Sequence, residues 1–149
     1  MRSGTFKIEY NVDMMTLDKR TRKVKDKSSI KNTIVNSGLE ILAKLLGGIT
    51  TTSFSAIAIG TDNTTATSSD TALGSEYTRA SADIAYEADY KAVFSYEFSF
   101  TESTTIYEVG IFDNAVSGGN MLNHAIDAGK AVDSDTSLTV DVTITCAEA

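Results

Sequence analysis

Several residue types are scarce or absent in this sequence, and each absence excludes a class of protein. Among 149 residues there is no proline, no tryptophan, one cysteine and one histidine. A lone cysteine, Cys146, cannot form an internal disulfide and excludes zinc sites built from several cysteines. No run approaches the roughly 18 apolar residues of a membrane-spanning helix, and residues 1–12 lack the apolar segment of a signal peptide. We therefore expect no membrane segment and synthesis in the cytosol.

The basic residues are concentrated near the start of the chain. Residues 1–31 hold nine basic and four acidic side chains, a balance of +5, whereas residues 32–149 hold four basic and sixteen acidic ones, a balance of −12. A hydrophobic content of 42% in a chain of this length is enough for one core, but not for two independent ones. The charge pattern predicts a basic N-terminal arm with one strand, residues 1–31, and a helix plus β-sandwich body, residues 32–149.

Alternation of apolar and polar residues indicates β-strands along most of the chain. It is clear in 6–12, 54–60, 90–100, 104–113, 120–127 and 137–146, and weaker in one longer strand at 75–88. Helical spacing within 31–46, followed by Gly47 and Gly48, predicts one α-helix, and Gly118 and Gly119 suit a hairpin turn. These patterns predict a mainly β protein. It would be an antiparallel two-sheet β-sandwich with one α-helix over an open end or edge, and an extended basic N-terminal arm.

Candidate catalytic and metal-binding groups are few. His124, the only histidine, shares a strand face with Leu122 and Ile126, and no pattern places a serine or Cys146 beside it. A structural or interface role is therefore favoured. Two acidic groups could offer oxygen ligands to calcium but match no loop motif, so they are interpreted as solvated turn carboxylates; they are Asp133 with Asp135, and Asp83 with Glu87 and Asp89. We predict no enzymatic activity, no cofactor and no metal.

The basic segment from Lys19 onward could contact phosphates, but it has no aromatic residue for base stacking and precedes a strongly acidic body. Docking on an acidic protein surface is therefore favoured over nucleic-acid binding. The strand at 6–12 is predicted to pair with the sheet edge of a neighbouring subunit. The predicted docking residues are Phe6, Ile8, Tyr10, Val12, Lys19, Arg20, Arg22, Lys23, Lys25 and Lys27.

Four segments occur in an order that resembles a known group of proteins. They are IVNSGLEILAKLLGG, SAIAIGTDNTTATSSDTALGSE, YEVGIFDNAVSGGNMLNHAI and DTSLTVDVTIT, within residues 34–145. This succession resembles small structural proteins of tailed bacteriophages, which are capsid decoration (cement) proteins or tail-fibre components. The loop at 60–74 departs from the pattern because it lacks the proline that relatives commonly carry, and the residues before 32 lie outside the resemblance.

The resemblance implies a non-enzymatic virion protein. The favoured role is a decoration protein that docks on the major capsid protein or other virion subunits and stabilises the capsid, as a homotrimer. The alternatives are a tail-fibre or baseplate component and, from another class, a carbohydrate-binding or hydrolytic module, for which Tyr77, Tyr86 and Tyr90 offer weak support. The polar tract at 60–74 can satisfy its own backbone through short side chains, so it is predicted to be a displayed surface loop.

Overall fold

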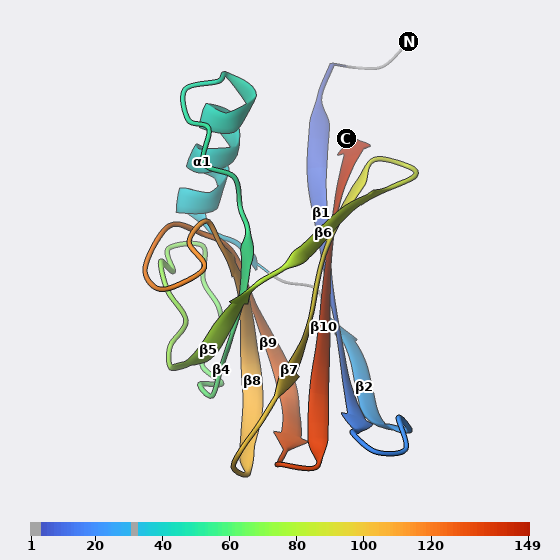
Figure 1. Ribbon diagram of the computed structural model, residues 1–149. Coiled ribbons are helices and arrows are strands. Elements are labelled where there is room, and N and C mark those ends of the chain that lie inside the picture. The colour runs from blue at the N-terminus through green and yellow to red at the C-terminus, as the bar shows by residue number, and fades with distance from the viewer. Residues whose placement is uncertain (1–3, 31–32) are drawn as a thin grey trace.

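The computed structural model describes residues 4–30 and 33–149, which fold into two five-stranded antiparallel sheets packed face to face (Figure 1). Sheet A has the strand order β2-β1-β10-β7-β6, and sheet B has the order β3-β9-β8-β4-β5. One helix, α1, accompanies them in the described part of the chain. The mainly β, two-sheet sandwich predicted from the alternation pattern is confirmed.

The strands differ greatly in length. Sheet A contains β1 (Phe6–Asp18), β2 (Val24–Ile30), β6 (Asp83–Glu87), β7 (Lys91–Ser99) and β10 (Thr136–Glu148). Sheet B contains β3 (Thr33–Ile34), β4 (Ala56–Gly60), β5 (Glu76–Ser81), β8 (Thr104–Phe112) and β9 (Met121–Val132). The two longest strands, β1 and β10, pair with each other over their whole length and form the centre of sheet A.

The hydrophobic core lies between the inner faces of the two sheets. Sheet A contributes fully buried side chains such as Val12, Met14 and Val140, and sheet B contributes Ile57 and Ile111. Burial of each such side chain stabilises the fold by about 1.5–3 kcal/mol relative to exposure. The alternation seen in the sequence thus follows from one face of each strand meeting the opposite sheet.

The N-terminal segment is part of this core and is not a separate arm. β1 pairs with β10 from Phe6 to Asp18, and β2 pairs with the other edge of β1. Tyr10 and Val12 are 8% and 0% exposed within their own chain, so the prediction that they pair with a neighbouring subunit is wrong. The predicted boundary does not divide the chain into an arm and a body, because β1 and β2 belong to sheet A. Residues 1–3 and 31 of the predicted arm lie outside the described residues. The basic composition of this segment does not indicate its strand register, because that register depends on pairing with β10, more than a hundred residues away in the sequence.

The weak strand predicted at 75–88 is in fact two strands in different sheets. β5 pairs with β4 in sheet B, whereas β6 pairs with β7 in sheet A. The chain crosses between the sheets at Ala82, whose N–H donates to the carbonyl of Ser55 at 2.8 Å. A continuous period of two cannot reveal such a crossing, because both halves keep the same alternation.

The predicted helix is confirmed as α1 (Asn36–Leu46). It packs on β9 through Gly38, where a Cβ atom would collide with the backbone of Leu122. Beyond its C-terminus, Gly48 has a φ of +66°, the left-handed conformation that favours glycine after a helix. Figure 1 shows α1 at the same end of the molecule as the first residues of β1 and the last residues of β10.

Candidate functional site

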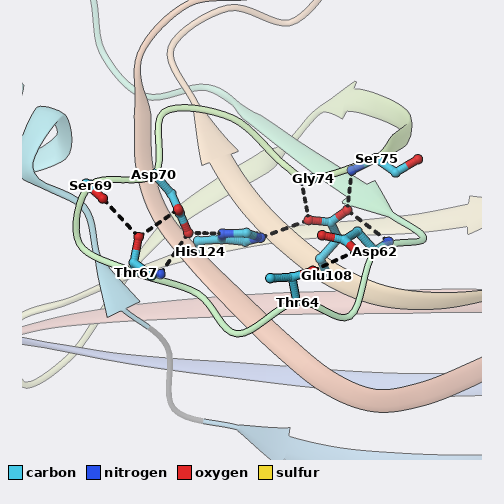
Figure 2. A network of polar contacts seen from close by, with 9 residues as sticks. All are labelled: Asp62, Thr64, Thr67, Ser69, Asp70, Gly74, Ser75, Glu108 and His124. Atoms are coloured by element: carbon cyan, nitrogen blue, oxygen red, sulfur yellow. Dashed lines mark hydrogen bonds and ion pairs between the residues drawn. The ribbon is translucent and has the colours of Figure 1, made fainter.

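The most developed polar site ties the surface loop at 61–75 to sheet B (Figure 2). Glu108 of β8 is 0% exposed and lies in the interior beside the loop. Its Oε2 accepts hydrogen bonds from the backbone N–H groups of Asp62 at 3.1 Å and Ser75 at 2.8 Å, and its Oε1 accepts one from Gly74 at 2.8 Å. One buried carboxylate therefore holds both ends of the loop.

His124 of β9 connects this carboxylate to the middle of the loop. Its Nε2 lies 2.8 Å from Oε1 of Glu108, and its Nδ1 lies 2.7 Å from Oδ2 of Asp70. Asp70 in turn accepts hydrogen bonds from the N–H and the hydroxyl of Thr67, both at 2.8 Å. We call Glu108, His124 and Asp70 the loop clamp, since together they attach three points of the loop to two strands.

The hydrogen-bond geometry shows how the loop clamp is connected. Both oxygens of Glu108 accept from backbone N–H groups. Each ring nitrogen of His124 faces a carboxylate oxygen, so the imidazole bridges the two acidic side chains. Burial works to raise the pKa of Asp70, but hydrogen bonds from Thr67 and His124 together hold that pKa below its ordinary value.

The loop clamp has the bonding of a structural unit. His124 is 4% exposed, and both of its ring nitrogens are engaged within the chain. It is thus buried and paired within the chain. The partners were not predicted, because Asp70 and Glu108 lie 54 and 16 residues from His124 along the chain. A charged residue in an otherwise apolar strand was the available signal.

The second feature is an apolar surface at the end of sheet A. Along the inner face of β1, exposure rises from 0% at Val12 and 8% at Tyr10 to 60% at Phe6. The pairing register places the same face on the neighbouring strands, where Ile84 and Tyr86 are 50% and 73% exposed. We call this surface the uncovered face; its exposed members are Phe6, Ile84 and Tyr86, and its half-buried members, which also pack against the core, are Ile8, Ala92 and Ile144.

A buried hydroxyl lies at the base of the uncovered face. Within the described part of the chain, the hydroxyl of Tyr10 is buried and has no hydrogen-bond partner. Burial, with a smaller contribution from Cys146, raises the pKa of Tyr10, so the phenol keeps its proton. A groove of about 590 Å³ lies at the tip of the same end, lined in part by Phe6, Tyr90 and Cys146.

The predicted basic docking residues lie on the β1–β2 hairpin, at the opposite end of sheet A (Figure 1). Several are used within the chain. Arg22 makes two hydrogen bonds of 2.7 Å to Glu97, Lys19 donates to the carbonyl of Ser134, and Lys25 donates to the hydroxyl of Thr136. Arg20, Lys23 and Lys27 are exposed. The structure thus separates the basic side chains from Phe6 and Ile8 instead of bringing them into one docking segment.

The acidic groups considered for calcium do not form a cage. Asp133 accepts hydrogen bonds from the N–H of Asp135 and the hydroxyl of Thr136, both at 2.9 Å. Asp83, Glu87 and Asp89 are exposed along the β6–β7 hairpin. In residues 4–30 and 33–149, no three His, Cys, Asp or Glu side chains converge as metal ligands would. No helix in these same residues is long and apolar enough to cross a membrane.

No protein family, curated protein or solved structure matches this chain. The resemblance to bacteriophage virion proteins therefore stays a prediction. What the fold defines is a β-sandwich with a clamped polar loop, an uncovered apolar face and a basic hairpin.

Proposed function

We propose that this chain is a non-enzymatic structural protein of a bacteriophage particle, and specifically a decoration protein that docks on the capsid and stabilises it. The resemblance over residues 34–145 to structural proteins of tailed bacteriophages supports the assignment to a bacteriophage particle. The uncovered face is the observation that carries the docking role. Soluble monomers rarely expose contiguous apolar patches unless the patches bind something, and three large side chains of this face are at least half exposed.

The uncovered face supplies the contact with the capsid. Burying Phe6, Ile84 and Tyr86 would contribute about 1.5–3 kcal/mol each, before the costs of association and side-chain ordering. This contact replaces the predicted docking of a free arm, because only the first residues of β1 remain accessible.

The other surfaces suit the same role. The loop at 61–75 carries mostly short polar side chains and is fixed by the loop clamp, so it presents an ordered surface to water. Exposed Lys23 and Lys27 can steer the protein toward an acidic surface of the particle. The tail-fibre or baseplate alternative differs in stoichiometry: a decoration protein is present in numbers comparable to the major capsid protein, and a tail protein in a handful of copies.

The test uses purified particles stripped of this protein, with the full-length chain added back. We expect Phe6→Ser combined with Ile8→Ser to weaken binding at least tenfold, because both side chains lie on the uncovered face. The matched control is Val116→Ser, which removes an apolar side chain that is 83% exposed on the distant β8–β9 turn. Equal binding by all three proteins would show that the uncovered face does not dock, and a low copy number in native particles would favour the tail.

A further inference from the structure

Sheet A has two open edges with opposite charge. In the described part of the chain, no strand pairs with the outer edge of β6 or with the outer edge of β2. All five residues of β6 are exposed, and it has no lysine or proline to discourage pairing with another strand. Open edges of this kind present unpaired backbone groups to other chains.

The charged side chains follow these two edges. Through the pairing registers of β7 and β10, Asp83 of β6 is level with Asp13 of β1 and lies on the same face of the sheet. Lys27 of β2 pairs with Met15 of β1. Since Asp13 and Met15 are both on the outer face of sheet A, Asp83 and Lys27 are on that face too. Glu87 is on that face as well. Both carboxylates are exposed at the edge formed by β6, and Lys27, with Lys23 just before β2, is exposed at the other edge.

This charge pattern disfavours pairing between like edges of two copies. An antiparallel β6–β6 contact centred on Ala85 would place Asp83 opposite Glu87 of the second copy, twice. A β2–β2 contact centred on Asp26 would place Lys25 opposite Lys27 of the second copy, twice, and the two Asp26 side chains opposite each other. Like charges directly opposite each other destabilise a strand pair, whereas opposite charges stabilise it. A β6–β2 contact brings Asp83 and Glu87 of one copy toward Lys23 and Lys27 of the other, so acidic and basic side chains meet on the outer face.

We propose that copies of this chain associate head to tail, with β6 of one copy beside β2 of the next, so that sheet A continues across the contact. Backbone hydrogen bonds between the strands supply affinity, and the charged side chains select the edge. Such a heterologous contact closes into a ring when the rotation between copies allows it. The inference goes beyond the proposed capsid role and can be tested without particles.

The two edges are staggered along the sheet. β6 lies level with residues 9–13 of β1, and β2 lies level with residues 12–17. Neighbouring copies must therefore shift along the strand direction, and strands that tilt relative to a ring axis accommodate such a shift, as in β-barrels.

The experiment measures the mass of the full-length protein by light scattering and sedimentation at micromolar concentrations. Variant one is Asp83→Lys with Glu87→Lys, variant two is Lys23→Glu with Lys27→Glu, and variant three carries all four changes. We expect the wild type to be oligomeric and variants one and two to associate at least tenfold more weakly. Variant three restores association, because reversing both edges recreates opposite charges. A mixture of variants one and two also associates.

Other outcomes overturn the proposal. A monomeric wild type removes it outright. If variants one and two assemble as the wild type does, the edges are not the contact. If variant three stays dissociated while its circular dichroism and thermal unfolding match those of the wild type, the two edges do not meet each other. Particle binding is measured separately, so a wild type that binds particles as a monomer would reject the head-to-tail contact and leave the decoration role standing.

Discussion

At the scale of single residues, the most consequential feature is the buried charge of Glu108. A carboxylate with no exposure is costly unless every acceptor position is satisfied. Three backbone N–H groups and the imidazole of His124 are its partners here. Because three of these four partners belong to the loop or its ends, the charge converts a polar tract with little apolar content into an ordered segment.

Replacing Glu108 with alanine should lower the free energy of unfolding by about 3–5 kcal/mol, the usual cost of removing one partner from a buried ionic network. The change leaves Nε2 of His124 without its partner and three backbone N–H groups without an acceptor. Urea unfolding at neutral pH measures it. Asp135→Ala is the control, since that side chain is exposed in the turn between β9 and β10, away from the proposed contact between copies, and it should change stability by less than about 0.5 kcal/mol. Similar values for the two variants would contradict the loop clamp.

A second buried carboxylate predicts an acid-dependent loss of stability. Asp127 is 4% exposed and accepts hydrogen bonds from Ser28, Gly129 and Lys130. Burial works to raise the pKa of Asp127, but Ser28, Lys130 and Gly129 together lower it below the ordinary value. Because the folded pKa lies below the unfolded one, this contribution is fully present above pH of about 4 and is lost as pH falls through the folded pKa.

The measurement is urea unfolding of the wild type and Asp127→Asn from pH 7 down to pH 2.5. We expect the variant to be less stable at neutral pH and the difference to shrink below a pH of about 4, where the carboxyl of the unfolded chain takes up a proton while the folded one, with its lowered pKa, still resists protonation. Asp135→Asn, at an exposed site in the turn between β9 and β10, serves as the control and should run parallel to the wild type. A difference between wild type and Asp127→Asn that stays constant with pH would exclude the stated contribution.

At the scale of elements, β1 shows how composition can mislead about structure. Its neighbours in sequence are basic and polar, yet the strand itself alternates as far as Met14 and pairs with β10 residue for residue. The adjacent residues Met14 and Met15 lie on opposite faces, the first fully buried and the second half-buried. The strand therefore belongs to the core, and removing it would remove the centre of sheet A.

The two methionines give a direct check of this register. Met14→Ala should destabilise the protein by about 2–5 kcal/mol, the usual cost of truncating a buried large side chain to alanine. Met15→Ala, the matched control one residue along, should cost less than about 1 kcal/mol because its side chain lies on the outer face. Chemical denaturation of both variants measures the difference. A reversed order would place the opposite face of β1 in the core.

At the scale of the whole molecule, the parts that sequence could predict are those set by local pattern. Period-two strands, the helix before Gly47 and the hairpin glycines at 118–119 all follow from side-chain spacing and backbone conformation, and the structure has each of them. The features it could not predict depend on distant partners. They include the pairing of β1 with β10, the crossing at Ala82 and the contact of Asp70 with His124. Spacing along a chain carries no information about which strand lies beside which.

The arrangement of loop, clamp and uncovered face predicts where the molecule tolerates added residues. A flexible ten-residue Gly/Ser insertion between Thr64 and Thr65 lies between the clamped points of the loop, where both side chains are exposed. Loop-closure entropy grows slowly with length, at about 0.6 kcal/mol per doubling, so the free energy of unfolding should fall by no more than about 1 kcal/mol.

The same insertion between Ser69 and Asp70 separates Asp70 from Thr67, whose N–H and hydroxyl position that carboxylate for His124. We expect it to cost about 2 kcal/mol or more, as disruption of a buried network does.

Urea unfolding compares the two insertions, and limited proteolysis should cut the first one while the sandwich stays intact. If both insertions were equally harmless, Asp70 would not hold the loop. If both were equally damaging, the loop would be packed along its whole length and not fixed at a few points above an exposed surface.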